Sequence, residues 1–347
     1  MLLRIIASIL GAALVGSWGA AADLDPASLP LHQEATWTAP DGFPDWAFPG
    51  LPAAARAGSA SESPPLRVPG SSVTYKVSDL HHMSAAPDWF PDEHPPAPPG
   101  ILAARSADVW ACGFCHLPNG NGRPENAVLA GLPAAYIRAE IAAFRSGERR
   151  SANPDWPPTR HMIEVAQNAT DDEIEAAANY FSSGKFTSRV TVTEAPEVPK
   201  IESLGFIWHQ IPGQKEPIGK RIVEMPVDAE DFEKRDPHAV FVADVPPGSL
   251  SSGRRLAEGQ GERPPCASCH GEGLRGGGDA VGPPLAGRSP TYLFRQLYGF
   301  KLGVRSNAGA EPMRVLARTL SEDEMIALAA YAASLPTEEV TPLTRSR

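Results

Sequence analysis

The sequence predicts a mainly α-helical protein: two small helical domains in tandem, an irregular proline-rich N-terminal arm and a short β-containing connector between the domains. Two observations support this fold class. A segment of roughly 70 residues is repeated after each of two Cys-x-x-Cys-His motifs. Proline accounts for 37 of the 347 residues, and 15 of these prolines lie between residues 23 and 100. A chain of this length has room for about two domains.

Residues 1–22 have the pattern of a secretory signal peptide. Arg4 precedes the apolar run 5–16, and the small residues 20–22 follow it. The alternative is an uncleaved membrane anchor, although the run is short for a membrane span. The sequence therefore predicts export, with the bacterial periplasm as the compartment.

Residues 23–100 form the expected arm. Their proline density opposes a compact helical domain and favours extended or turn structure. Disordered tails are usually poor in aromatic residues, whereas this segment contains Trp37, Phe43, Trp46, Phe48, Trp89 and Phe90. We therefore expect the arm to pack along the helical domains.

All four cysteines lie in the motifs Cys112-Gly-Phe-Cys115-His116 and Cys266-Ala-Ser-Cys269-His270. This pattern is typical of haem c attachment, because cysteines three residues apart lie on one side of a helical turn and can both bond one porphyrin. The histidine that follows is then placed as the proximal iron ligand. The alternatives are two small disulfides or a shared zinc site. The motifs predict two covalently bound haem c groups.

The repeat defines the two helical domains, residues 101–186 and residues 251–336. Leu129-Ala-Gly matches Leu285-Ala-Gly, and the matched positions that follow fall at helical spacing. Thr170-Asp-Asp-Glu173 matches Ser321-Glu-Asp-Glu324, and each of these segments has the pattern of a capping box that begins a helix. Residues 337–347 are expected as a C-terminal tail.

The same alignment predicts the sixth ligands, Met162 and Met313, each eight residues before a capping box. A thioether is a soft ligand that suits low-spin iron. His161 is an alternative to Met162, and both are expected on a loop. Met325 aligns with Ile174 and is expected in the core. The remaining candidates are expected to be packing methionines or loose surface histidines: Met83, Met225, His81, His82 and His94.

The connector, residues 187–250, contains short stretches that favour strands. These are Arg189–Thr193, Phe206–Trp208 and Arg221–Val223, which suggest a hairpin or a small sheet over the joint between the domains. The formal net charge of −10 argues against a nucleic-acid-binding protein. No apolar stretch is long enough to indicate a membrane-spanning bundle.

The tandem motifs, each followed by a methionine before a capped terminal helix, resemble the dihaem class I cytochromes c of the cytochrome c4 type. The resemblance covers about residues 101–186 and 251–336, and it implies two small α-helical cytochrome c domains with their haems near the domain interface. It also implies that His116 and Met162 ligate one iron and that His270 and Met313 ligate the other. In the family a proline carbonyl orients the proximal imidazole; Pro283 matches that proline, and Ala127 replaces it in the first repeat.

Two six-coordinate irons leave no open site for oxygen or peroxide, so we expect an electron carrier and not an enzyme. Its partners would be redox proteins: a dehydrogenase, an oxidase or another cytochrome. One alternative is a cytochrome subunit of a dehydrogenase or terminal oxidase complex, associated peripherally with the membrane. Another alternative is a dihaem peroxidase-type enzyme, for which we find no acid–base constellation.

Overall fold

We describe a computed structural model of the chain, which covers residues 38–50, 65–106, 109–204, 206–259, 263–277 and 281–338. These residues all belong to one compact unit, Ala35–Arg347. The signal-peptide pattern at 1–22, Trp37 and most of the predicted C-terminal tail lie outside the described residues. No helix in the described ranges has the length and apolar character needed to cross a membrane.

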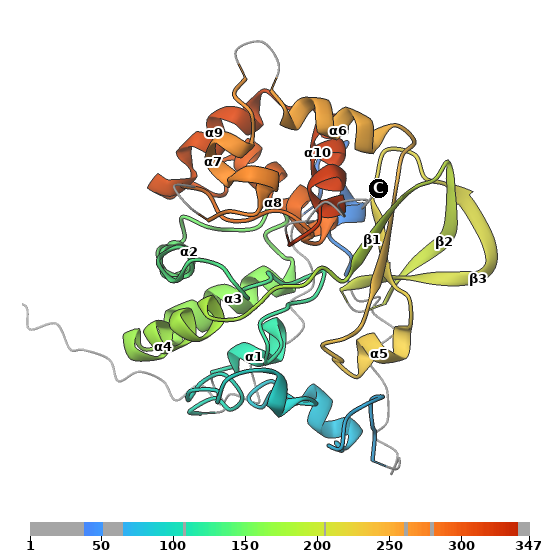
Figure 1. The fold of residues 1–347 in the computed structure, drawn as a ribbon. Helices are drawn as coiled ribbons and strands as arrows, with labels where there is room; N and C mark the ends of the chain where they lie inside the picture. The colour runs from blue at the N-terminus through green and yellow to red at the C-terminus, as the bar shows by residue number, and fades with distance from the viewer. Residues whose placement is uncertain are drawn as a thin grey trace, which may run out of the picture. The chain divides into compact units, whose positions relative to one another are not determined.

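The two repeats form matching sets of helices (Figure 1). The first repeat contains α1 (Cys112–His116), α2 (Ala134–Ser146), α3 (Pro157–Asn168) and α4 (Asp171–Ser182). The second contains α6 (Ser249–Ala257), α7 (Ala267–His270), α8 (Pro290–Leu302), α9 (Glu311–Arg318) and α10 (Glu322–Ser334). The other helical elements of the described residues are short: η2 (Asp45–Ala47), η4 (Val77–His81), η5 (Pro91–Glu93), α5 (Ala229–Glu233), η6 (Glu272–Leu274) and η7 (Ala308–Ala310).

Both predicted capping boxes are confirmed. The Thr170 hydroxyl accepts a hydrogen bond from the backbone N–H of Glu173, and the Glu173 carboxylate accepts one from the backbone N–H of Thr170. Ser321 and Glu324 do the same at the start of α10. Each pair satisfies two backbone donors that a helix N-terminus otherwise leaves free. The helix boundaries inferred from the repeat therefore have a local physical cause.

The repeats differ at their N-terminal ends. In the second repeat α6 packs against α10, and the approach is so close that a side-chain carbon at Gly253 would collide with the carbonyl oxygen of Ala327. The first repeat has no helix in this place; the segment 94–99 contains four prolines and is irregular. The expectation of two copies of one helical domain therefore holds for the later helices but not for this one.

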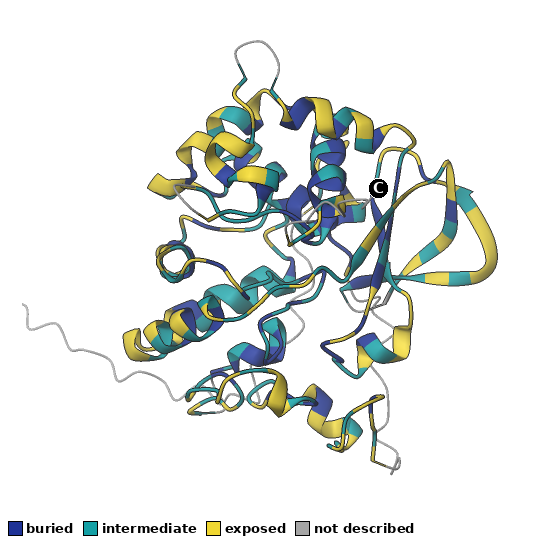
Figure 2. Ribbon diagram, in the orientation of Figure 1, coloured by how far each residue is buried: buried dark blue, intermediate teal, exposed yellow. Residues whose placement is uncertain are grey.

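The connector forms two small sheets, as the strand-favouring stretches predicted. The first sheet has the order β1 (Val190–Glu194), β5 (Phe241–Val245), β4 (Val223–Pro226), with β1 parallel to β5 and β4 antiparallel to it. The second is the antiparallel pair β2 (Glu197–Leu204) and β3 (Ile207–Pro217), with a register shift between Pro199 and Ile201. Figure 2 shows that the outer part of this hairpin is largely exposed.

One part of the arm, residues 38–50, is bound by three parts of the protein. Its backbone carbonyls accept hydrogen bonds from Trp156 of the first repeat (to Pro49 O, 3.1 Å), Trp208 of the connector (to Trp46 O, 2.8 Å) and Arg295 of the second repeat (to Ala47 O, 2.9 Å). Trp46 also packs on Phe294, with 4.4 Å between ring centroids. In this segment the arm packs along both domains, as expected.

A buried ion triad joins the two repeats. The Glu140 carboxylate on α2 lies 2.5 Å from the Arg149 guanidinium and 2.7 Å from that of Arg305. Arg149 and Arg305 occupy equivalent positions in the two repeats, and their backbones form an isolated antiparallel bridge. Burial alone would raise the pKa of Glu140, but the two arginines lower it below its ordinary value. The triad therefore stabilises the contact between the repeats with Glu140 ionised.

We predict that Glu140→Gln lowers the apparent free energy of unfolding by about 3 kcal/mol, because two buried guanidinium groups lose their counter-charge. Chemical unfolding of the haem-loaded protein, followed by far-UV circular dichroism, measures this effect. The matched control is Glu175→Gln, whose exposed pair with Arg138 is worth less than about 1 kcal/mol. Equal losses in the two variants would contradict the role given to the triad.

The same triad makes the folding stability of the protein depend on pH. Since the folded-state pKa of Glu140 is lowered, its contribution to stability is fully present above pH 4.5, the ordinary value, and is lost as the pH falls through the folded pKa. We therefore expect the stability difference between wild type and Glu140→Gln to shrink on acidification below that pH. A difference that stays constant down to the acid-unfolding transition would show that Glu140 is not ionised in the folded protein.

Candidate functional site

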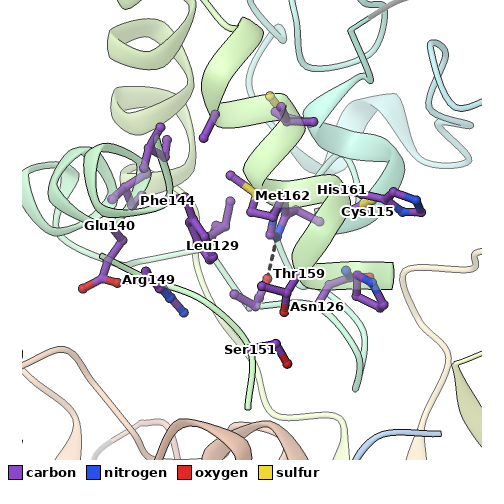
Figure 3. A pocket seen from close by; sticks show the side chains of 18 of the residues that line it. Cys115, Asn126, Leu129, Glu140, Phe144, Arg149, Ser151, Thr159, His161 and Met162 are labelled. Atoms are coloured by element: carbon purple, nitrogen blue, oxygen red, sulfur yellow. Dashed lines mark hydrogen bonds and ion pairs between the residues drawn. The ribbon is translucent and has the colours of Figure 1, made fainter. Parts of the chain in front are cut away.

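The first motif lies in the wall of a large cavity. Cys112, Cys115 and His116 from α1 and Met162 from α3 all line it, together with apolar side chains that include Leu129 and Phe144 (Figure 3). The cavity holds about 1490 Å³ of empty space, part of it open to solvent, which is ample for a ligand of cofactor size. The structure thus brings together the four residues that the sequence assigned to the first haem.

A backbone carbonyl orients His116. Its Nδ1 lies 2.8 Å from the carbonyl oxygen of Ala127, so the neutral ring donates from Nδ1 and keeps Nε2 free to act as a ligand. Burial is the main cause that lowers the pKa of His116, and the bond to Ala127 opposes the shift. The replacement of the expected proline by Ala127 therefore leaves this hydrogen bond in place.

His270 is held in the same way in the second repeat. Its Nδ1 lies 2.7 Å from the carbonyl oxygen of Pro283, and burial lowers its pKa against the effect of that bond. The loop approaches the ring closely at Gly282, where a side-chain carbon would lie 2.7 Å from the His270 Nδ1. Both histidines are thus held in the neutral form that can ligate a metal.

The four cysteines form no disulfide with one another. The described residues also contain no group of three or more His, Cys, Asp or Glu side chains arranged around a common metal position. Burial raises the pKa of the Cys112 thiol to about 12 and also raises the pKa of Cys115 and Cys266. The cysteines form two pairs, and each pair is followed by a histidine whose ring is oriented by a hydrogen bond. Each such set of residues fits the attachment site of one haem c.

Met162 was expected on a loop, but both predicted ligand methionines lie on helices. Met162 lies in the middle of α3, and Met313 lies near the start of α9, half-buried against Phe300, Ala310 and Ala317. Each of these helices begins with proline in its first turn, which is why a segment that resembles a loop in sequence is helical. Met325 is fully buried in the core, as its alignment predicted.

His161 also lies in the cavity wall beside Met162 (Figure 3). Its ring packs against the Trp110 ring with 4.0 Å between centroids. Burial, and then the charge of Arg160, lowers the pKa of His161 to about 4. The His161 ring is thus neutral and remains the alternative to Met162.

The three histidines of the arm behave differently from one another. His81 and His82 are exposed, as expected for surface residues. His94 is not a loose surface histidine: its side chain is 8% exposed, with Asp88 3.1 Å from Nε2 and the Tyr180 hydroxyl 2.9 Å from Nδ1. The prediction for His94 was wrong because its partners come from another part of the arm and from α4.

Sequence reasoning missed the residues that close the first cavity from outside its own repeat. Phe48 comes from the arm, whereas Arg295 and Arg305 come from the second repeat. Arg149 and Arg305 had a visible signal, because each follows a matched glycine, Gly147 or Gly303, by two residues. No sequence pattern marked Phe48 or Arg295 as a residue of this cavity, since only the folded chain brings them there.

Comparison with known proteins gives matches to both repeats. The family model described as "Cytochrome c" matches residues 103–185 and 253–336. A thiosulfate dehydrogenase electron acceptor of Stutzerimonas stutzeri (strain A1501) is 30% identical over 236 residues, which is 67% of this chain and 82% of the relative. Cytochrome c4 of Stutzerimonas stutzeri is 30% identical over 67% of this chain and 88% of its own length, and cytochrome c4 of Azotobacter vinelandii is 25% identical over 67% and 88%.

The family model spans both motifs, both oriented histidines and the helices of the two repeats, except for the start of α6. A cytochrome c fold that occurs twice in one chain implies two covalently bound haem c groups and electron transfer as the activity. The chain belongs to the dihaem cytochromes c of the cytochrome c4 type.

Proposed function

We propose that this dihaem cytochrome carries electrons between redox proteins of the periplasm and catalyses no reaction of its own. His116 and Met162 would be the axial ligands at one site, and His270 and Met313 those at the other. The observation that carries the proposal is that Cys112, Cys115, His116 and Met162 line one cavity. When bound, haem c supplies one-electron chemistry at its iron.

The ligand residues are in forms that suit this role. Burial keeps both imidazoles neutral, and the carbonyls of Ala127 and Pro283 fix the ring orientation through Nδ1. A methionine thioether is neutral at every pH, and it raises the reduction potential relative to a second histidine. These residues therefore support a site that accepts and releases an electron without taking up a substrate.

The carboxylates of the first cavity are engaged in other interactions. Glu140 is bound by two arginines, Glu125 lies 3.2 Å from Arg123, and Glu173 serves the capping box of α4. A peroxidase needs an acid–base group free to act beside an open metal position. The Glu125 Oε2 atom has no hydrogen-bond partner, but the engagement of Glu140 and Glu173 favours a carrier over the peroxidase-type enzyme.

A second candidate is a cytochrome subunit bound to a dehydrogenase or oxidase. One relative is named as an electron acceptor of thiosulfate dehydrogenase, so a dehydrogenase is a reasonable donor for this chain as well. The export signal proposed at residues 1–22 suits either role. Co-purification from native periplasm and membranes distinguishes them, because a free carrier is recovered alone and a subunit with its enzyme.

For the wild-type holoprotein we predict a methionine–iron charge-transfer band from both haems in the ferric state, and no binding of carbon monoxide after reduction. The reason is that His and Met side chains fill both axial positions at each site. Optical spectroscopy measures both properties. Carbon monoxide binding to either haem would contradict the carrier and support an enzyme with an open metal site.

We predict that Met313→Ala opens the second site to carbon monoxide and lowers the reduction potential of that site by on the order of 100 mV. This shift is a fraction of the roughly 0.8 V range over which axial ligands set the potentials of haem proteins. Potentiometric titration followed by optical spectra measures both effects. Met325→Leu is the matched control, since Met325 is a fully buried core residue of the same repeat. An unchanged potential in Met313→Ala would show that Met313 is not a ligand.

Met162→Ala and His161→Ala together decide the ligand of the first site. We expect only Met162→Ala to open that site to carbon monoxide, because Met162 supplies the thioether there. His161→Ala should keep the charge-transfer band, with a small change from the lost contact with Trp110. The opposite pattern, recorded by the same spectra, would assign the ligand to His161.

A further inference from the structure

The two attachment motifs differ in exposure although they are equivalent in sequence. In α1, Gly113 and Phe114 are buried and Cys115 is half-buried. At the matching positions of α7, Ala267, Ser268 and Cys269 are all exposed. Figure 2 shows α7 largely exposed and α1 largely buried. The protein therefore covers its first motif and leaves its second open.

The arm covers the first motif through backbone contacts. The N–H groups of Cys112 and Gly113 donate to the carbonyls of Gly100 and Ile101, both at 2.9 Å. A side-chain carbon at Gly113 would lie 2.8 Å from the Ile101 carbonyl oxygen, which is closer than such atoms approach. The second motif has Ala267 at this position, where no such cover exists. The choice of glycine in the first motif is thus explained by Ile101, at the start of the first domain, and by Ala86 of the arm, whose side chain would lie 3.2 Å from the added carbon.

A half-buried arginine of the connector, Arg235, completes the cover. Arg235 donates to the carbonyl of Phe114 at 2.7 Å and to the carbonyl of Leu80 at 2.9 Å. Its guanidinium carbon lies 3.6 Å from the centroid of the Phe114 ring. Arg235 thereby fastens the arm and α1 together. In the second motif Ser268 replaces Phe114 and offers no ring for such a contact.

The covalent chemistry of the motif turns this difference into a functional one. When haem c is bound, each cysteine sulfur would be joined to the porphyrin, so an exposed cysteine would hold part of that group near the surface. Cys269 is exposed, whereas Cys115 packs with Ala86, Ala111 and Phe114 beneath the arm. Of the two motifs, the second would therefore offer a partner the more accessible thioether.

We propose that electrons enter and leave this protein through the surface around Cys269, and that its partner is a redox protein with an apolar docking face. This inference rests on the proposed electron-carrier function. One electron passes between the reduced centre of one protein and the oxidised centre of the other, and no bond is made or broken. We name this surface the open edge; its described residues are Pro264, Pro265, Ala267, Ser268, Cys269 and Val281.

The composition of the open edge specifies the partner. None of its described residues is charged, and Val281 is 86% exposed. Val281 lies beside Cys269, because the N–H of Gly282 donates to the Cys269 carbonyl at 2.8 Å. Along the chain the flanking described charges are Arg263, which lies 3.4 Å from Glu324, and Glu272. A small apolar surface around a redox centre favours a partner surface of the same kind, since both lose water on contact.

The first haem site would then exchange electrons through the second. Its cavity is closed on one side by Tyr292, Gln296 and Gly299 of α8, so the second repeat forms part of its wall. The chain offers a direct contact between the first site and the second repeat, and the arm covers the motif on α1. We therefore expect the two haems to act in series and not as two independent entry points.

The test is the oxidation of the fully reduced holoprotein by tris(1,10-phenanthroline)cobalt(III), followed by stopped-flow absorbance. We expect Ser268→Trp, which adds a ring over the open edge, to slow the oxidation of both haems about tenfold, equivalent to about 1.4 kcal/mol. Ser251→Trp is the matched control, because Ser251 is exposed on α6 of the same repeat. The same variants are then mixed with horse heart cytochrome c at high ionic strength, where charge steering is screened, and the same loss is expected.

A second variant tests whether the arm shields the first motif, through an increase in the rate of haem oxidation. Arg235→Ser removes the guanidinium that fastens the arm over α1, so in the Ser268→Trp background we expect it to restore a fast phase with about half of the absorbance change. A wild-type rate in Ser268→Trp would overturn the open edge while leaving the carrier function intact. Absence of a fast phase in the double variant would overturn the role of the arm. A wild-type holoprotein that neither probe oxidises would instead refute the proposed function itself.

Discussion

Glu140 supplies the buried negative charge at the contact between the two repeats. Glu140 lies between Arg149 and Arg305, which come from equivalent places in the two halves of the chain. If Glu140 were absent, two guanidinium groups with 9% and 5% exposed side chains would face each other without compensation. Arg149 of the triad also donates hydrogen bonds to Tyr292 and Gln296 of α8, which line the first cavity, so the environment of one redox site is built partly by the other domain.

A second constraint comes from outside the repeats. Residues 38–50 present three backbone carbonyls to Trp156, Trp208 and Arg295, which belong to three different parts of the chain. Each of these donors is large and buried or half-buried, so each would lose hydrogen bonding if the segment were removed. The proline-rich arm is therefore an integral part of the fold and differs from a tail added to two finished domains.

The sequence was sufficient for features that depend on local chemistry. The two Cys-x-x-Cys-His motifs, the capping boxes at Thr170 and Ser321 and the core position of Met325 all follow from spacing and from the internal repeat. The helical setting of Met162 and Met313 was not foreseen, because prolines at the start of a helix resemble loop residues in isolation. The burial of His94 and the cover formed by Arg235 depend on contacts between distant residues, which no periodicity records.

The arm that lies on α1 also has a consequence for the biogenesis of the protein. Covalent attachment of a porphyrin requires access to both thiols of a motif, and the final structure leaves the first pair half-buried beneath residues 83–102. Attachment at Cys112 and Cys115 is therefore favoured before residues 83–102 dock on α1. Cys269 remains exposed in the finished fold, so its motif places no such restriction on the order of assembly.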